Sequence, residues 1–507
     1  MSVIAPPREG PSVGEPAPAF QQRLGLFDAT MLVAGTMIGS GIFIVSADIA
    51  RDTGSSGWLM AVWVLTGIMT MMGALSYAEL AGMMPHAGGQ YVYLRDAYSP
   101  LWGFLYGWAV FLVIQTGSIA AVAVAFAKFL GVLAPPLGTD PKSGAFVLCE
   151  LPGVGIITAG QIVAVGVIVV LTWLNCRGVQ EGKWVQNLFT VGKTAALVLL
   201  IVLGLTVAAH PGLFAENMRQ PWGAITETAR YQDVAQRLPQ WTWLIALMVA
   251  GGSMTGSLFS ADAWNNVTFT AGEVKNPRRT LPWSLALGAG LVIVLYLLAN
   301  VAYLSALPLH GDPHGATAVE RGGIDHANTD RVGTAVLEQV SPDLGVPFMA
   351  IAIMVSTFGC VNGMTLMGAR LYYAMARDGL FFKSVGRLNK NGVPAAGLVL
   401  QGIWSALLVF SGKYNDLLDY VMFSVLVFYV LTVIGLFVLR RKMPNAERPY
   451  KALGYPIMPA LYVFLCAIIM IDLLVVKTFN TGAGLVLLIA GIPVYFIWRL
   501  IGQPARS

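Results

Sequence analysis

The strongest constraint on this chain is a series of apolar runs, each about 20 residues long, the length that an α-helix needs to cross a bilayer. Only 11% of the 507 residues are charged, against about 25% in a typical soluble domain. The runs are continuous and do not alternate apolar with polar residues, which argues against a β-barrel. The sequence therefore predicts an all-α, polytopic membrane protein.

Twelve spans are expected, and two polar loops, 209–240 and 308–345, then fall on the same side of the membrane. A clear majority of the 31 Lys and Arg residues lie on the other side, which predicts that both termini are cytoplasmic. The expected spans lie near 27–50, 57–84, 99–134, 156–175, 184–208, 241–271, 281–307, 346–376, 394–411, 417–440, 456–476 and 483–500.

The first apolar run is weakened at its centre by the stretch "GTMIGSGIF", residues 35–43. Each glycine costs a helix interior roughly 1 kcal/mol relative to alanine. The sixth run contains a comparable stretch, "GGSMTGSLFSADAWNN", residues 251–266. Paired broken helices at matching positions of two repeats indicate a transporter binding site, and a spacing of five spans implies that the second repeat is inverted.

This pattern divides the chain into four parts. They are a disordered tail (1–23), a first five-helix repeat (24–208), an inverted second repeat (241–440) and two extra helices (456–500). The tail has no apolar core, so no cleavable signal is expected.

A broken helix can bind both ends of a free amino acid. The half that begins near Ser40 and Gly41 offers unpaired N–H groups to a carboxylate. The half that ends near Met37 and Ile38 offers carbonyl groups to an ammonium ion. Close helix packing is the alternative explanation for these glycines, and the matching break in the sixth run favours binding.

Several stretches, quoted in order, resemble the amino acid–polyamine–organocation superfamily, and within it the L-type amino acid transporters, the light subunits of heteromeric exchangers. The stretches are "GTMIGSGIF", "SYAELAGMMPHAGGQYVYL", "NLFTVGKTAALVL", "FSADAWNNVTFTAGEVKNPRRTLP", "GCVNGMTLMGARLYYAMARDG" and "ERPYKALGYPIMP". The resemblance implies the inverted five-helix repeat and amino acid transport by alternating access.

The same resemblance implies roles for individual residues. The substrate carboxylate is expected at Gly39, Ser40 and Gly41, and the amine at backbone carbonyls of Met37, Ile38, Phe259 and Asp262. Phe259 is expected to close the outer gate, and Asn362 to face the substrate side chain.

Lys193 lies in the middle of an apolar run, where a lysine needs a partner or a task. The resemblance implies that its ammonium replaces a sodium ion and contacts carbonyls near the first break. Snorkelling to the interface is the alternative, but the interface is distant. No cofactor or metal site is expected, because none of the five histidines is mid-span and the four cysteines are far apart.

Two roles are open for Asp262: it caps the second half of the sixth span, or it faces the pocket as an ionised carboxylate. A cap favours neutral substrates, which we expect, and an exposed carboxylate favours cationic ones. Glu79 and Arg95 flank the inner stretch "PHAGGQYVY", and Arg370 and Arg377 flank "LYYAMARDG". These residues are candidates for inner-gate ion pairs, or the arginines are topological signals only.

Two departures from the animal branch indicate a prokaryotic relative in a bacterial inner membrane. Gly272 stands where that branch has an acidic residue, and the surroundings of Cys149 differ from those of the cysteine that joins the heavy chain. A heavy-chain glycoprotein partner is therefore not expected, and Cys149 is expected to be a free thiol.

Three functions compete. The first is a sodium-independent exchanger of neutral amino acids, the second a proton-coupled importer of amino acids or polyamines, and the third a nutrient sensor or membrane enzyme. No nucleophile–base pair or metal motif supports an enzyme, and nothing indicates a nucleic-acid partner.

Overall fold

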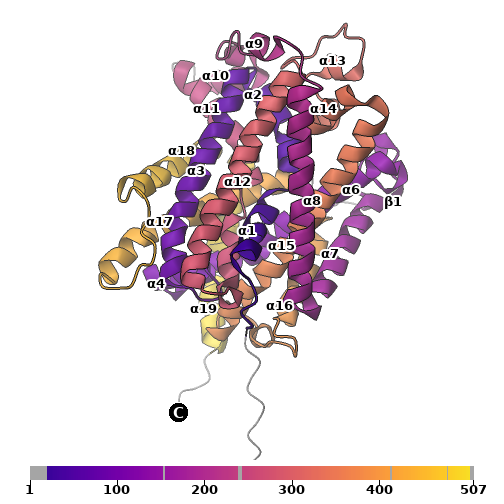
Figure 1. Cartoon of the computed structure of the whole chain (residues 1–507). Coiled ribbons are helices and arrows are strands. Elements are labelled where there is room, and N and C mark those ends of the chain that lie inside the picture. The colour runs from indigo at the N-terminus through magenta and orange to yellow at the C-terminus, as the bar shows by residue number, and fades with distance from the viewer. Residues whose placement is uncertain (1–19, 152–154, 238–241, 411–413, 477, 503–507) are drawn as a thin grey trace, which may run out of the picture.

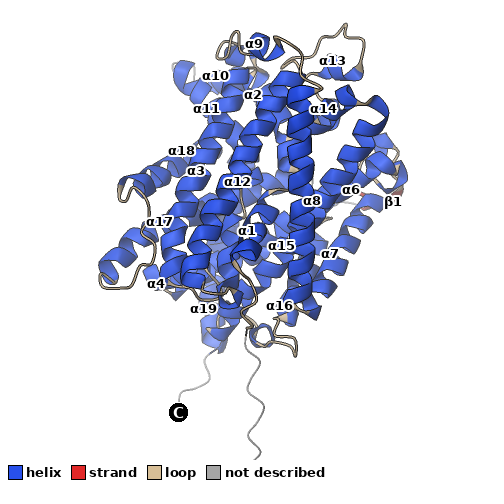
Figure 2. Ribbon diagram, viewed as in Figure 1, coloured by secondary structure: helices blue, strands red, loops and turns tan. Residues whose placement is uncertain are grey.

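The computed structural model describes residues 20–151, 155–237, 242–410, 414–476 and 478–502. Within these ranges the protein is almost entirely helical, and the exception is one antiparallel hairpin of strands β1 and β2 (Figure 2). Residues 1–19 of the expected tail lie outside the described part.

The long helices run side by side along the molecule (Figure 1). Nine segments of the described chain are long and apolar enough to cross a membrane, and three shorter apolar helices accompany them. The principal helices are α3 (Ser56–Met83), α7 (Ala159–Arg177), α8 (Val179–Thr206), α12 (Pro277–Ala306), α15 (Pro342–Arg377), α16 (Ala395–Leu408), α17 (Tyr414–Lys442), α18 (Ile457–Val476) and α19 (Thr478–Gly502).

The remaining membrane-length segments are interrupted. The first consists of α1 (Leu26–Met37), the 3₁₀ turn η1 (Gly41–Phe43) and α2 (Val45–Thr53). The third consists of α5 (Pro100–Ala109), the π-helical turn η2 (Val110–Ile114) and α6 (Gln115–Leu133). The sixth consists of α11 (Thr242–Ser260) and the 3₁₀ helix η6 (Trp264–Glu273).

Short elements fill the connections. They are α4 (Gln90–Ala97), η3 (Pro135–Leu137), η4 (Pro141–Ser143), β1 (Val147–Leu151), β2 (Gly155–Thr158), α9 (Leu213–Asn217), η5 (Ala224–Glu227), α10 (Ala229–Arg237), α13 (Ala318–Gly322), η7 (Asn328–Asp330), α14 (Val332–Val340) and η8 (Lys383–Gly386). The span expected at 156–175 thus begins with a strand, and its helix starts at Ala159, where Thr158 and Gln161 form a capping box.

The two ends of the molecule differ. One end, called the loop end, carries α9, α10 and α13, which belong to the two long polar loops (Figure 1). The opposite end carries α4 and α16 and is called the terminal end. The loops therefore share one side, as the sequence predicts.

At the loop end, the connection after α12 is fastened to α2. Arg51 donates to the Asp325 carbonyl at 2.6 Å and to the Asp330 carboxylate at 2.6 Å. His310 contacts the Gly54 carbonyl at 3.2 Å and the Asp325 carboxylate at 2.7 Å. These bonds hold α2, the second half of the broken first segment, against its neighbouring loop.

The helix pairs that surround the two breaks form the core. α12 packs along α3 and α1, and α15 packs along α6 and α8. Consequently α1 is enclosed by α8, α12 and α15, and its residues from Leu32 to Met37 are all buried.

The ion pairs at the terminal end differ from those considered from the sequence. Glu79 is fully buried and pairs with Arg440 at 2.6 Å and Arg448 at 3.2 Å, not with Arg95. Arg95 pairs with Asp96 and with Asp378 at the end of α15. Glu79 and Arg95 therefore both form ion pairs, but not with each other.

Arg370 forms a buried ion pair with Glu273. Its Nη2 lies 3.0 Å from Glu273 Oε1, and both side chains are 1% exposed. A further guanidinium nitrogen donates to the Leu366 carbonyl within α15. The pair joins α15 to the end of η6, whereas Arg377 is exposed.

We expect Arg370→Met to destabilise the protein by about 3–5 kcal/mol, because it leaves the buried Glu273 carboxylate without its partner. The thermal midpoint of detergent-purified protein measures this, and Arg377→Met, which removes an exposed arginine from the same helix, is the control. Adding Glu273→Met to Arg370→Met should restore most of the loss. A single variant no less stable than the Arg377 control would contradict the role of the pair.

Candidate functional site

The breaks in the first and sixth segments lie next to each other around one cavity, here called the break cavity. α1 stops at Met37 and η1 starts at Gly41, while α11 stops at Ser260 and η6 starts at Trp264. The cavity is lined by Thr36, Met37, Gly39, Ser40, Gly41, Ser118, Val122, Phe259, Ser260, Asp262, Ala263, Cys360 and Met364.

The second break depends on an unusual backbone conformation. Ala263 has φ +67° and ψ 5°, in the left-handed region that residues other than glycine rarely adopt. Such a residue costs of order 1 kcal/mol or more, and strain of this kind gathers at functional sites. It turns the chain so that residues 261–263 separate α11 from η6.

Two glycines of the first break are required by close approach. A Cβ on Gly35 would lie 2.2 Å from Gln186 Nε2 and 2.2 Å from Thr190 Oγ1 of α8. A Cβ on Gly41 would lie 1.9 Å from Ser260 Oγ and 3.2 Å from its Cα. Gly35 therefore serves helix packing, and Gly41 lets the two breaks approach each other.

Lys193 reaches the first break from α8. Its side chain is fully buried, and its ammonium donates to the carbonyls of Gly35, Ile38 (2.8 Å) and Ser356 (3.1 Å). These bonds use all three donors of the ammonium. The carbonyl end of α1, where the helix dipole is negative, thus stabilises the buried charge.

The carbonyls at the first break already have donors. Met37 O accepts from Tyr296 Oη at 2.9 Å, which leaves one of its two lone pairs. Ile38 O accepts from Lys193, and the Ser356 hydroxyl lies 3.0 Å from both the Ile38 and the Gly39 carbonyl, to one of which it can donate its hydrogen. The amine role of Met37, Ile38 and Phe259 stays a prediction.

The N–H side of the same break is open to the cavity. The backbone N–H groups of Gly39 and Gly41 donate to no acceptor among the described residues. Gly39, Ser40 and Gly41 all line the break cavity, beside Phe259. The residues predicted for a substrate carboxylate are therefore brought together, and that role stays a prediction.

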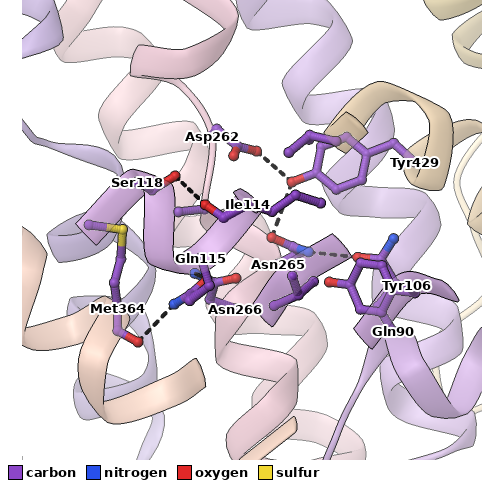
Figure 3. Close-up of a pocket in the computed structure, with 13 residues that line it drawn as sticks. Gln90, Tyr106, Ile114, Gln115, Ser118, Asp262, Asn265, Asn266, Met364 and Tyr429 are labelled. Carbon is purple, nitrogen blue, oxygen red and sulfur yellow. Dashed lines mark hydrogen bonds between the residues drawn. The ribbon is translucent and has the colours of Figure 1, made fainter. Parts of the chain in front are cut away.

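A second cavity, here called the polar cavity, adjoins the first, and Figure 3 shows its lining. The two share Ser118, Asp262, Ala263 and Met364. Its other lining residues are Gln90, Tyr106, Val110, Ile114, Gln115, Asn265, Asn266, Val425 and Tyr429. The polar cavity therefore lies directly beside the breaks, with these four residues between the two cavities.

Asp262 lies at the junction of the two cavities. Its Oδ1 is 2.5 Å from Tyr429 Oη, and it lines both cavities. The N-cap of η6 is Ala263, and no side chain caps this helix. The capping role expected for Asp262 is therefore wrong, because the turn at Ala263 directs the carboxylate into the cavity.

Asn362 lines neither cavity. Its side chain is fully buried and bonds to Asn175 (2.9 Å), the Gly182 carbonyl (3.1 Å) and Gln186 (3.1 Å). Two positions along a helix correspond to a turn of about 200°, so Cys360 and Met364 of α15 face the break cavity instead. Asn362 tethers α15 to α7 and α8.

Sequence reasoning missed the polar residues that surround Asp262. Gln90, Gln115, Asn265 and Tyr429 come from four segments and meet in the polar cavity (Figure 3). Buried amides within apolar segments are costly unless paired, and that signal could have singled out Gln115 and Asn265 in their runs.

Comparison with known proteins now bears on this geometry. Residues 24–496 match the family model described as "Amino acid permease". The chain belongs to the amino acid permease family. It is therefore a membrane transporter and not an enzyme.

The relatives of this permease include amino acid transporters of animals. The large neutral amino acids transporter small subunit 2 of Mus musculus is 32% identical over 97% of this chain and 83% of its own length. The b(0,+)-type amino acid transporter 1 of Mus musculus is 29% identical over 85% of this chain and 79% of its own length.

We expect Gly41→Val to abolish substrate binding by the permease, because the added side chain would overlap Ser260 at the point where the two breaks meet. Ser40→Ala should weaken binding less. Stabilisation of the purified protein against heat by added amino acids measures binding.

Gly166→Val is the matched control, since a Cβ on Gly166 of α7 would meet nothing within 4 Å. The control should keep the stabilisation by amino acids. Undiminished stabilisation in Gly41→Val would remove Gly41 from the site.

Proposed function

We propose that this permease is a sodium-independent exchanger whose main substrates are neutral L-amino acids. The observation that carries the proposal is the cavity formed where two broken segments meet, which adjoins a polar cavity and shares four lining residues with it. The head of the amino acid binds at the backbone of Gly39, Ser40, Gly41, Met37 and Phe259.

The proposed architecture has twelve spans, with an inverted repeat of five helices in each half and two additional helices. The nine long apolar segments and the three shorter apolar helices, Leu26–Met37, Ala395–Leu408 and Gly484–Leu500, together provide that number. Alternating access then follows from movement of one set of helices around the breaks, with Phe259 as the outer lid.

The proposed location of the permease is the plasma membrane, as the inner membrane of a bacterium. In the proposed orientation, the terminal end faces the cytoplasm. Basic residues concentrate in the connections near 274–280 and 440–451, which supports this orientation. Cys149, on the exposed hairpin, has a free thiol. We propose that the permease works without a heavy-chain partner, although relatives are named small subunits.

Independence from sodium rests on Lys193. Its ammonium occupies a position among carbonyls of α1 and α15, where it supplies the fixed positive charge that a bound cation supplies elsewhere. The same contacts fasten α8 to both helices.

We expect uptake of labelled leucine into proteoliposomes preloaded with leucine to be unchanged when choline replaces sodium. Lys193→Ala should slow exchange by at least about tenfold, or about 1.4 kcal/mol, because the carbonyl end of α1 loses the ammonium that joins it to α8 and α15. Lys390→Ala, which removes an exposed lysine, is the control. Loss of wild-type uptake in choline would refute the role of Lys193.

A second candidate function is proton-coupled or cationic amino acid transport. It is favoured by one observation, the Asp262 carboxyl in the cavity wall. A negatively charged wall attracts a cationic side chain, and a carboxyl group there can also carry a proton.

We expect neutral amino acids to displace labelled leucine at lower concentrations than arginine does, because the remaining lining of both cavities is uncharged. A competition panel on wild type and Asp262→Asn measures the order. Arginine as the strongest competitor, with its competition alone lost in the variant, would replace the first proposal by the second.

A further inference from the structure

We propose that Asp262 makes the polar cavity hold one positive charge in every transport step, either a proton beside a neutral substrate or the cationic side chain of the substrate itself. The inference rests on the proposed exchange of amino acids and adds what moves with them. It is carried by the direction of a hydrogen-bond chain that ends at Asp262.

The chain starts at a fixed acceptor. Gln90 Nε2 lies 3.2 Å from the Phe428 carbonyl and 2.9 Å from Thr432 Oγ1. The carbonyl can only accept, and the Thr432 hydroxyl already donates to the same carbonyl at 2.7 Å. The amide nitrogen of Gln90 must therefore point to α17, and its oxygen must point to Asn265.

That orientation determines the next one. Asn265 Nδ2 donates to Gln90 Oε1 at 2.8 Å, so the oxygen of Asn265 faces Tyr429, at 3.1 Å from the hydroxyl. The direction of both amides follows from the backbone carbonyl of Phe428 and not from a choice between equivalent atoms. Figure 3 shows the bonds from Gln90 through Asn265 and Tyr429 to Asp262.

The Tyr429 hydroxyl therefore lies between two oxygens. Asn265 Oδ1 can only accept, and Asp262 Oδ1, 2.5 Å away on the other side, can only accept when it is ionised. Tyr429 has one hydrogen, which cannot serve both. The chain is complete when Asp262 carries a proton, because the carboxylic acid then donates to Tyr429 and Tyr429 donates to Asn265.

Nothing else in the cavity walls supplies the missing charge. The break cavity, the polar cavity and a third cavity on the far side of Asp262 have no Lys, Arg or His among their described lining residues. The ionisable groups that face Asp262 from other helices are tyrosines: Tyr77 of α3, Tyr106 of α5, Tyr429 of α17 and Tyr462 of α18. Lys193 commits its three donors to carbonyls.

Two states of the substrate site provide the positive charge and the hydrogen-bond donor that Asp262 lacks. A neutral amino acid leaves the carboxyl uncompensated, so a proton from water binds Asp262 and is released on the opposite side with the substrate. A lysine side chain brings its own ammonium, which replaces that proton as donor and as charge. When lysine enters and leucine leaves, one proton should therefore leave together with each leucine.

The test uses proteoliposomes of the full-length permease, loaded with leucine and the pH-sensitive dye pyranine in weak buffer. Leucine–leucine exchange, followed with labelled leucine, moves no net proton and reports the proposed function itself. External lysine should then drive leucine out with one proton for each leucine, so that the interior becomes alkaline. The rate should not change with membrane potential, since one positive charge enters and one leaves.

Three variants test whether the Asp262 carboxyl carries the transported proton. Asp262→Asn should lose lysine exchange, and any leucine that still leaves should carry no proton. Asp262→Glu retains a carboxyl and should retain the proton signal per leucine. Asp312→Asn removes an exposed carboxylate on the loop after α12 and should behave as wild type.

The outcomes are distinguishable. Leucine–leucine exchange without any lysine transport, or lysine–leucine exchange that is driven by membrane potential and shows no proton signal, overturns the inference and leaves the exchanger intact. A proton signal that persists in Asp262→Asn also overturns it. Absence of leucine–leucine exchange in well-folded wild type overturns the exchanger and the inference together.

Discussion

The three bonds from the Lys193 ammonium to backbone carbonyls are the interaction on which the rest of this structure depends. A helix that stops inside an apolar core leaves carbonyl groups without partners, at a cost of several kcal/mol for each. Lys193 supplies donors to Gly35 and Ile38 of α1 and to Ser356 of α15. The Lys193 ammonium therefore stabilises the break, because it gives the unpaired carbonyls a donor. The carbonyl oxygens in turn stabilise the buried positive charge.

Segments and breaks could be predicted from the sequence, because both depend on local composition. The apolar runs of membrane-spanning length specify where the long helices lie. The glycines and the serine of residues 35–43 mark where the first of these helices is interrupted. The position of the second break was less exact. The chain turns at Ala263, after the three glycines of the stretch, because a left-handed alanine and not a glycine makes the turn.

The orientation of side chains could not be predicted, because it depends on neighbours from distant segments. Asn362 is two residues from Cys360, yet the helical turn directs it to α7 and α8. The bonds from Lys193 and Ser356 to the carbonyls near Ile38 come from α8 and α15, which no local pattern reveals. Likewise, Glu79 is near Arg95 in sequence but binds Arg440 in the last turn of α17 and Arg448 after it, more than 350 residues later.

The short extended contact between Leu24 and Val274 has a mechanical consequence. The backbone N–H groups of Arg23 and Leu24 donate to the Glu273 carbonyl, and that of Lys275 donates to the Leu24 carbonyl at 2.8 Å. The start of α1 and the end of η6 are thereby joined into a single unit at the terminal end, and the breaks at residues 38–40 and 261–263 separate this unit from η1 and from α11. Neither helix of the unit can tilt alone, and the ion pair between Glu273 and Arg370 connects the unit to α15 at the point where its two chains are bonded.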